Sequence, residues 1–217
     1  AAKLTGVFEK FVPKEFMNRI APEGLENLIF GHAESDFVTI LFSDIRAFTE
    51  ISENLSPQEL MDFLNGYLRE MNPPIMEHQG FVDKFIGDAI MAVFDQPDKT
   101  NADEAENALD AALGMQKVLV QLNQKRKKLK LDPVSIGIGI HSGNVIIGTV
   151  GFEERMDSTV LGDAVNLASR LEGLTKFYGC CLIISEDTHG LLRNQKKYHT
   201  RELDRVMVKG RKTPLNI

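Results

Sequence analysis

The chain has 217 residues, of which 43% are hydrophobic, and this is enough for one large domain with a real core. Its net charge of −6 excludes a general nucleic-acid binder, and its only cysteines, Cys180 and Cys181, are adjacent, which excludes a disulfide framework and indicates buried thiols. Its apolar runs are too short to span a bilayer, and its first ten residues include three charged ones, unlike a secretory signal. We therefore expect a cytoplasmic domain, although a longer polypeptide could be anchored to a membrane upstream of it.

Residues 1–30 differ in pattern from the rest of the chain. Apolar residues recur there at helical spacing, with an interruption at Pro13, which predicts two short amphipathic segments before Gly24. Such segments either connect the chain to an upstream module or pack on the surface of their own domain. We therefore divide the chain into a helical connector, residues 1–30, and one domain, residues 31–217.

The first long apolar run predicts a central strand, and a capped helix should follow it. Residues 37–43 are β-branched, aromatic or otherwise apolar at nearly every position, as in strands buried on both faces, and the run ends at Asp44. Residues 56–59 read Ser-Pro-Gln-Glu, which is typical of a helix start with a capping box. Pro73-Pro74 should end this helix, and a short helical piece through residues 75–76 should follow.

Two apolar runs within residues 81–94 meet at Gly87-Asp88, which predicts a β-hairpin. A two-residue connection with Gly first is typical of a type II′ turn. Lys84 would be the one cation on an otherwise apolar face. It would either lie at the sheet edge with its ammonium reaching water, or face an anionic or hydrogen-bonding group that compensates its charge. The predicted register pairs Ile86 with Ala89, Lys84 with Met91 and Val82 with Val93.

A long helix and two strands should follow the hairpin. The helix begins after the turn-rich segment 98–103 and ends in the basic run Lys125–Lys128, which we expect to be a solvated helix end. Residues 134–141 predict a strand, residues 142–144 a turn and residues 145–150 a second strand. The glycines of these strands match no dinucleotide-binding or phosphate-loop motif and indicate close packing instead.

The last third of the chain predicts a strand at residues 156–161 and a helix that begins at Gly162-Asp163. Asn166 and Arg170 of this helix are four residues apart, so they share one face. The remaining predicted elements are a strand at 181–184, a helix that Ser185 caps and that runs through Leu191, and strands at 198–203 and 206–208.

The order strand, helix, hairpin, helix, strand is that of the ferredoxin-like βαββαβ palm, an α/β (α+β) fold, here with additional strands and helices. In this topology the first strand and the hairpin are neighbours, so Asp44 and Asp88 should converge at one edge of the sheet. Two close carboxylates either shift their protonation or share a cation, and Mg²⁺ commonly binds one or two carboxylates while leaving sites for substrate phosphates. Because neither aspartate is where a helix cap is needed, the pair predicts a metal site.

Three segments of the chain together carry a family resemblance. Residues 42–49 read FSDIRAFT, residues 83–92 read DKFIGDAIMA and residues 159–170 read TVLGDAVNLASR. In this order they resemble the signature blocks of the class III nucleotidyl cyclases, and most of all the bacterial, cyanobacterial-type adenylyl cyclases that carry Thr at the purine-reading position. The resemblance extends from about residue 37 to the C-terminus, and it implies the nucleotidyl cyclase fold.

The resemblance implies a metal site and a base-reading pair. Asp44 and Asp88 match the two metal-binding aspartates, with the carbonyl of Ile45 as a further ligand, and two Mg²⁺ or Mn²⁺ ions per site are implied. Lys84 and Thr159 match the pair that reads the purine. Lys84 would donate to adenine N1, and Thr159 would accept from the 6-amino group.

The resemblance also implies the reaction. ATP would be converted to 3′,5′-cyclic AMP and pyrophosphate by attack of its own 3′-hydroxyl on the α-phosphorus, with one metal lowering the pKa of the hydroxyl and both holding phosphate oxygens in line. Asn166 and Arg170 match the residues that position the ribose and stabilise the transition state, and Lys209 and Arg155 match groups that contact the terminal phosphates.

In the family, the metal aspartates and the nucleotide-reading residues of one site come from different subunits. The resemblance therefore implies a homodimer with two equivalent sites and an inactive monomer. It also implies that residues 1–30 connect to an upstream sensor on the same polypeptide. One alternative is a guanylyl cyclase, for which an acceptor such as Glu would suit position 84, and another is an inactive cyclase-like module that dimerises or relays a signal.

Overall fold

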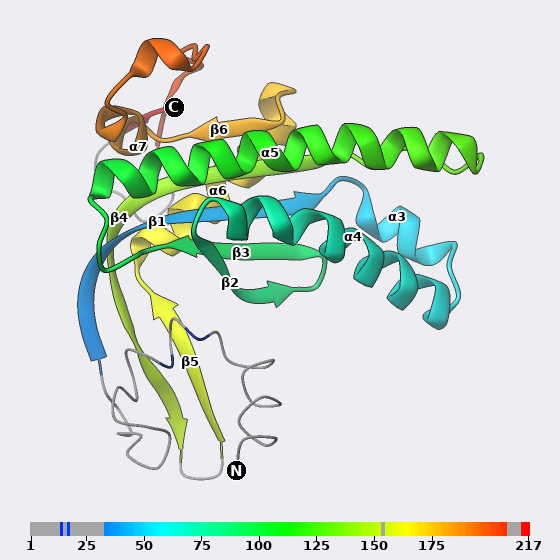
Figure 1. The fold of residues 1–217 in the computed structure, drawn as a ribbon, viewed down its shortest axis with the longest axis horizontal. Helices are drawn as coiled ribbons and strands as arrows, with labels where there is room; N and C mark the ends of the chain where they lie inside the picture. The colour runs from blue at the N-terminus through cyan, green and yellow to red at the C-terminus, as the bar shows by residue number, and fades with distance from the viewer. Residues whose placement is uncertain (1–13, 15–16, 18–32, 153–154, 208–213) are drawn as a thin grey trace.

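The computed structural model describes residues 14, 17, 33–152, 155–207 and 214–217 (Figure 1). The predicted connector at residues 1–30 lies, apart from two helical residues, outside this part of the chain. No helix within the described ranges combines the length and the apolarity that a bilayer crossing needs.

The strands are β1 Ala33–Ile45, β2 Gly80–Ile86, β3 Ala89–Phe94, β4 Ile136–Phe152, β5 Arg155–Leu161, β6 Leu182–Ile184, β7 Arg205–Val206 and β8 Leu215–Asn216. The helices are α3 Phe48–Glu53, α4 Pro57–Glu77, α5 Asn101–Lys128, α6 Asp163–Tyr178 and α7 Glu186–Leu191, with a 3₁₀ turn at Gln195–Lys197.

Six strands form one sheet with the order β2-β3-β1-β4-β5, in which β6 pairs with β4. β1 lies between β3 and β4 and is antiparallel to both, while β4 and β6 are parallel. Residues 38–42 of β1 are all buried, so the prediction of a central strand is confirmed. The βαββαβ order is also confirmed, because the hairpin and the strand after α5 flank β1 on opposite sides.

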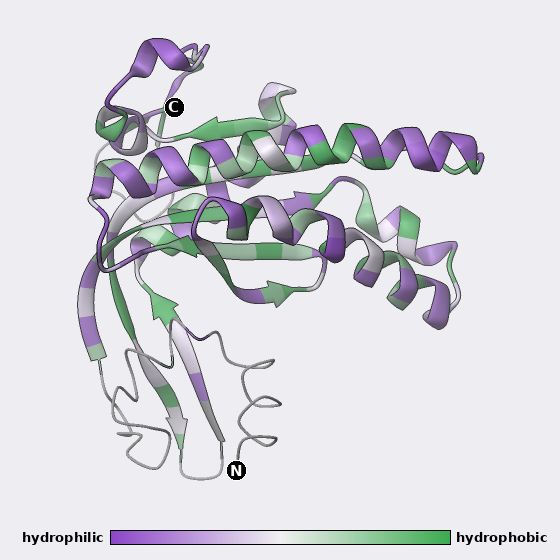
Figure 2. Ribbon diagram, in the orientation of Figure 1, coloured by the Kyte–Doolittle hydropathy of each residue, from purple (hydrophilic) through white to green (hydrophobic). Residues whose placement is uncertain are grey.

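Helices cover both faces of this sheet. Successive residues of β1 alternate between the faces, so Leu41 packs with α4 and α5, whereas Ile40 and Phe42 pack with α6. Figure 2 shows that the strands are mostly hydrophobic, while the C-terminal end of α5 is mostly hydrophilic. The basic run Lys125–Lys128 lies at that end and is largely exposed, as predicted.

Helix α4 begins at the predicted cap but continues past its predicted end. Ser56 Oγ accepts a hydrogen bond from Glu59 N–H, and the Glu59 carboxylate accepts one from Ser56 N–H. The helix runs through Pro73-Pro74 to Glu77, so the prediction of a separate helical piece is wrong. Pro74 is buried against α5, where the missing side chain of Gly114 leaves it room, and this packing offsets the backbone hydrogen bonds that the prolines remove.

Strand β4 is continuous over 17 residues, so the predicted turn at residues 142–144 is wrong. Its pairing with β1 runs unbroken through Thr39↔Ser142 and Val38↔Gly143. Ser142 Oγ lies 2.8 Å from Thr39 Oγ1 in a buried hydrogen bond, and a Cβ on Gly143 would lie 3.1 Å from Ala164 Cβ of α6. The small residues Ser142 and Gly143 therefore serve close packing in a continuous strand.

The C-terminal segment also differs from the prediction. Residues 198–203 are not a strand, and the β7–β8 ribbon that follows has two residues in each strand. Cys180 and Cys181 are free, as predicted, but Cys180 is half-buried and Cys181 is exposed. They lie between the left-handed Gly179 at the end of α6 and the first paired residue of β6, so they occupy a surface turn and the prediction of two buried thiols is wrong.

We expect Gly139→Ala to destabilise the domain and to displace α6. A Cβ at this position would lie 2.2 Å from the Glu172 amide nitrogen and 2.4 Å from the Ala168 carbonyl oxygen, so the helix backbone has to move. Overpacking of this kind costs about 1–3 kcal/mol, and each kcal/mol lowers the melting temperature by about 2–4 °C. Thermal unfolding measures the effect. Gly173→Ala is the control, because nothing lies within 4 Å of a Cβ there, and an equal melting temperature for the two variants would contradict the close packing.

Candidate active site

The predicted metal ligands meet at one end of the sheet. Asp44 is next to the last residue of β1, and Asp88 is the second residue of the turn between β2 and β3. β1 and β3 are paired up to Ser43↔Ile90, which brings the two aspartates close together. Asp88 Oδ2 accepts a hydrogen bond from Ile45 N–H at 3.2 Å, so the three predicted ligands are neighbours.

The two carboxylates are electrostatically uncompensated. Burial, followed by the hydrogen bond and the charge of Asp88, raises the pKa of Asp44 to about 7. Within the described residues, neither aspartate forms an ion pair with Lys or Arg, and no cluster of three or more acidic, His or Cys side chains is present. A pair of carboxylates that lacks a protein cation fits Mg²⁺ or Mn²⁺, which keep water and substrate oxygens as their remaining ligands.

The hairpin turns at Gly87-Asp88 as predicted, but β2 contains an irregularity. A type II′ turn requires a positive φ at its first central residue and a negative φ at its second. Gly87 has a φ of 65° and the φ of Asp88 is not positive, so both conditions are met. The two pairs nearest the turn match the predicted register, whereas Val82 pairs with Ala92 and not with Val93. Asp83 is an extra residue in a β-bulge, and regular alternation along β2 is therefore wrong at this point.

Lys84 and Thr159 lie on the first and last strands of the sheet order and yet touch. Lys84 Nζ of β2 donates a hydrogen bond to Thr159 Oγ1 of β5 at 2.7 Å. The sheet is curled, since Phe81 of β2 and Val160 of β5 belong to one apolar cluster that also contains residues of α6. The two residues predicted to read the purine are thus in contact within a single chain.

Asn166 and Arg170 lie on α6, which begins where the sequence predicts. Gly162 precedes the helix with a φ of 151°, a conformation that favours glycine. Asn166 is exposed and Arg170 is half-buried. Arg170 Nη1 is buried and has no hydrogen-bond partner among the described residues. A buried donor without an acceptor is rare, and this one fits an anionic ligand such as a phosphate.

The sequence analysis missed Arg46 and Glu172, which attach α6 to the end of β1. Arg46 Nη1 lies 3.2 Å from Glu172 Oε1, and the same guanidinium donates to Thr175 Oγ1. The side chains of Arg46, Glu172 and Thr175 all cover Gly137 of β4, where a Cβ would collide with them. Gly137 indicated close packing in the sequence, but no sequence pattern identified the residues that pack against it.

Two predicted phosphate-binding residues are not described. Lys209 falls within residues 208–213, outside the described ranges. Arg155 is the first residue of β5, but its side chain also lies outside the described part of the structure. Their roles stay predictions.

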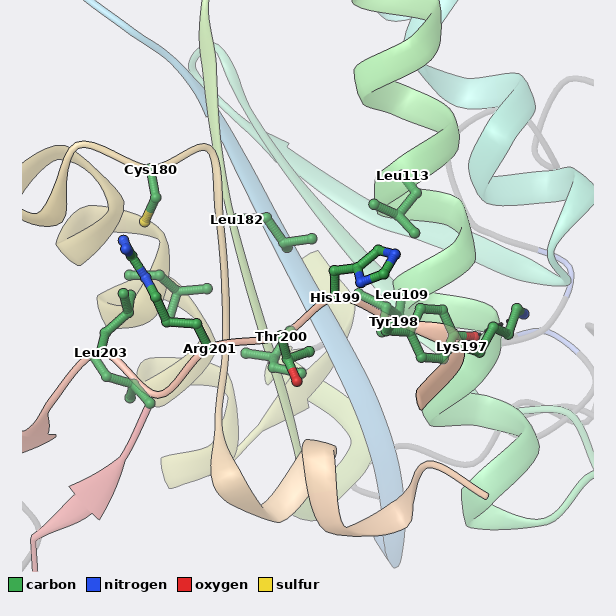
Figure 3. A pocket seen from close by; sticks show the side chains of 13 residues that line it. Leu109, Leu113, Cys180, Leu182, Lys197, Tyr198, His199, Thr200, Arg201 and Leu203 are labelled. Carbon is green, nitrogen blue, oxygen red and sulfur yellow. Dashed lines mark hydrogen bonds between the residues drawn. The ribbon is translucent and has the colours of Figure 1, made fainter. Parts of the chain in front are cut away.

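One well-formed cavity of the described structure lies away from these residues. It has a volume of about 440 Å³ and lies between α5, β6 and residues 197–203 (Figure 3). Leu113 and Leu182 contribute to its apolar wall, and His199 and Arg201 come from the C-terminal segment. None of the predicted site residues lines it.

Comparison with known proteins decides the family. The family model described as "Adenylate and Guanylate cyclase catalytic domain" matches residues 30–216. The chain belongs to this family. The chain is 47% identical over 215 residues to an adenylate cyclase of Anabaena cylindrica, and the alignment covers 97% of this chain and 42% of that protein. The chain spans less than half the length of that protein and of two further curated adenylate cyclases that it matches.

Solved structures agree with the family and with the predicted cyclase fold. The adenylyl cyclase CyaB from P. aeruginosa superposes with a TM-score of 0.77 at 34% identity, covering 85% of this chain and 93% of that one. The guanylyl cyclase Cya2 superposes with a TM-score of 0.74, also at 34% identity, covering 85% and 91%. Because these neighbours include cyclases of both kinds, similarity of fold alone does not distinguish ATP from GTP as the substrate.

Proposed function

We propose that the cyclase domain converts ATP to 3′,5′-cyclic AMP and pyrophosphate. The observation that carries this proposal is the hydrogen bond from Lys84 to Thr159. An ammonium only donates, so Lys84 would donate to adenine N1, and the second lone pair of the Thr159 hydroxyl would accept from the 6-amino group. Guanine presents a donor at N1 and an acceptor at position 6, so it fits the pair poorly. The adenylate cyclases among the relatives support the same choice.

Asp44, Asp88 and the carbonyl of Ile45 would hold two Mg²⁺ or Mn²⁺ ions. Bound ions of this kind lower the pKa of an attacking hydroxyl and neutralise phosphate charge. The contribution of the chain is to fix two carboxylates at the ends of paired strands without a protein cation beside them. The raised pKa of Asp44 indicates that its ionised form is destabilised where no cation is present, and a bound metal ion would supply the missing positive charge.

Arg170 and Asn166 would act on the sugar and the α-phosphate. As the 3′ oxygen gives up its proton to water and bonds to the α-phosphorus, the bond to the pyrophosphate oxygen breaks and charge builds on the phosphoryl oxygens, to which the unpartnered Nη1 of Arg170 would donate. Asn166, one turn earlier on the same face, would bind the ribose. Lys209 and Arg155 would contact the terminal phosphates. Positioning and charge neutralisation are sufficient here, so no protein nucleophile is needed.

We also propose a two-fold homodimer in which the metal aspartates of one subunit face the nucleotide held by its partner. Support comes from large apolar side chains that are about half exposed on the β2–β3 hairpin and on β4 and β5, on either side of Lys84 and Thr159. These side chains are Phe85, Ile86, Ile146, Val150, Phe152 and Leu161. Residues 1–30 would connect the dimer to an upstream sensor domain, in keeping with the greater length of the relatives.

We expect kcat/KM for ATP to exceed that for GTP by about 10²-fold, because guanine would forfeit two hydrogen bonds that are each worth about 1.5 kcal/mol. Lys84→Glu replaces a donor with an acceptor and should reduce this preference. Parallel turnover assays with Mg²⁺ or Mn²⁺, at concentrations where the protein is dimeric, measure both. Equal rates with the two nucleotides would reject the adenine assignment, and no turnover with either would favour an inactive signalling module.

A further inference from the structure

A β-bulge places Asp83 and Lys84 on the same side of β2. Val82 pairs with Ala92 and Lys84 with Met91, which leaves Asp83 as the extra residue. In a regular strand, consecutive side chains point to opposite faces, so the sheet itself would separate the two charges. The bulge removes this separation, and Lys84 Nζ lies 3.5 Å from Asp83 Oδ2.

The carboxylate of Asp83 is far more buried than the ammonium beside it. The Asp83 side chain is 1% exposed, whereas the Lys84 side chain is 36% exposed. Neither carboxylate oxygen has a hydrogen-bond partner within the described part of the chain. A buried carboxylate without donors is costly, and the charge that compensates this one is the Lys84 ammonium. Asp83 therefore exerts its effect through Lys84.

The contacts of Lys84 leave a defined set of hydrogen-bonding groups for a ligand. An ammonium has three N–H donors, of which one is given to Thr159 Oγ1, while the Asp83 carboxylate attracts the ammonium from 3.5 Å without a hydrogen bond. A donor therefore remains for a ligand that also meets the second lone pair of the Thr159 hydroxyl. A donor beside an acceptor complements N1 and the 6-amino group of adenine. A lysine released from Asp83 would turn on its flexible stem and reach the 6-carbonyl of guanine.

We propose that Asp83 is a positioning residue that holds the Lys84 ammonium in the orientation that selects adenine over guanine. This inference rests on the proposed base-reading role of Lys84 and Thr159. In addition to these two residues, the buried carboxylate of Asp83 would act as a counter-ion of Lys84. It would not contact the substrate, but it would determine which N–H of Lys84 faces the base.

The test compares kcat/KM for ATP and GTP, with Mg²⁺ and the full chain, in Asp83→Asn, Lys84→Met and the double variant. Asp83→Asn keeps the size of the side chain and removes its charge. We expect the ATP/GTP ratio to fall about tenfold, the size of one hydrogen bond to a charged group, chiefly through a higher KM for ATP. With Lys84→Met already present, Asp83→Asn should change the ratio by less than about twofold, because the lysine through which it acts is gone.

The matched control is Glu104→Gln on α5. Glu104 is also buried, and one of its carboxylate oxygens has no hydrogen-bond partner among the described residues. The substitution therefore removes a buried carboxylate at a position away from Lys84. Its ATP/GTP ratio should equal that of the unmodified chain. Thermal unfolding establishes that each variant is folded, and Asp83→Ser replaces Asp83→Asn if the latter does not fold.

The outcomes separate this inference from the proposed function. If Asp83→Asn lowers turnover of ATP and GTP equally, or changes the ratio as much with Lys84→Met as without it, Asp83 is only structural and the inference is overturned. If Lys84→Met itself leaves the ratio unchanged, the proposed base-reading function fails. A ratio that falls in both single variants and falls no further in the double variant supports both.

Discussion

Asp44→Asn is expected to abolish cyclase turnover and, with metal removed, to make the domain more stable. The amide cannot replace a carboxylate as a metal ligand, so we expect activity to fall by about 10³-fold, as for other losses of a charge-stabilising group. Without metal, the substitution removes a buried charge and its repulsion with Asp88. Each kcal/mol gained in this way raises the melting temperature by about 2–4 °C.

The gain in stability depends on pH in a defined direction. The pKa of Asp44 is raised from an ordinary value of 3.8 to about 7, so the folded state binds this proton more tightly than the unfolded state does. Stability of the unmodified chain therefore falls as pH rises from about 4 to about 7. Thermal unfolding in EDTA should show Asp44→Asn above the unmodified chain at pH 8 and equal to it at pH 4.

Magnesium provides the second comparison for this variant. Mg²⁺ should raise the melting temperature of the unmodified chain and leave that of Asp44→Asn almost unchanged, because a ligand stabilises only the protein that binds it. Glu53→Gln, which removes an exposed carboxylate at the end of α3, should alter neither turnover nor the response to metal. A less stable Asp44→Asn protein in EDTA at pH 8 would show that the two carboxylates do not repel each other in the folded chain.

Mixing Asp44→Asn with Arg170→Ala chains is expected to restore activity that neither has alone. Arg170→Ala should lose about 10²–10³-fold in turnover, because it removes a preorganised donor. If each site takes its metal aspartates from one subunit and its Arg170 from the other, a mixed dimer has one intact site. With free exchange at equal concentrations, half of the dimers are mixed, so the mixture should reach about a quarter of the unmodified activity.

The control for the mixture is Asp44→Asn with Asp88→Asn. In the proposed dimer both residues belong to the same half of each site, so every dimer in this mixture would lack a complete set and no activity should return. Size-exclusion chromatography establishes that the chains associate. Full activity loss in the Asp44→Asn and Arg170→Ala mixture, despite association, would place all of these residues in one subunit.

Local sequence signals predicted the elements that depend on neighbours in the chain. Ser56 forms its capping box, Gly87-Asp88 turns the hairpin, and Gly162 starts the helix that carries Arg170. The order of these elements was enough to place Asp44 beside Asp88, because the βαββαβ topology makes their strands adjacent.

Features that depend on distant partners could not be predicted in this way. The bulge at Asp83 leaves no mark in the alternation of residue types, and the pairing of Ser142 with Thr39 decides that β4 continues where the sequence indicated a turn. The ion pair of Arg46 with Glu172 likewise joins residues 126 positions apart. In each case a tertiary contact overrides the local preference.

The curl of the sheet has a consequence for regulation. Lys84 and Thr159 stand on its first and last strands, whereas Asp44 and Asp88 stand at the ends of adjacent inner segments. A slight flattening would separate the outer pair and leave the inner pair in place. If the two pairs have the proposed roles, a change in curvature would alter the affinity for the base and leave the metal ligands in place, and it would change KM before it changes kcat.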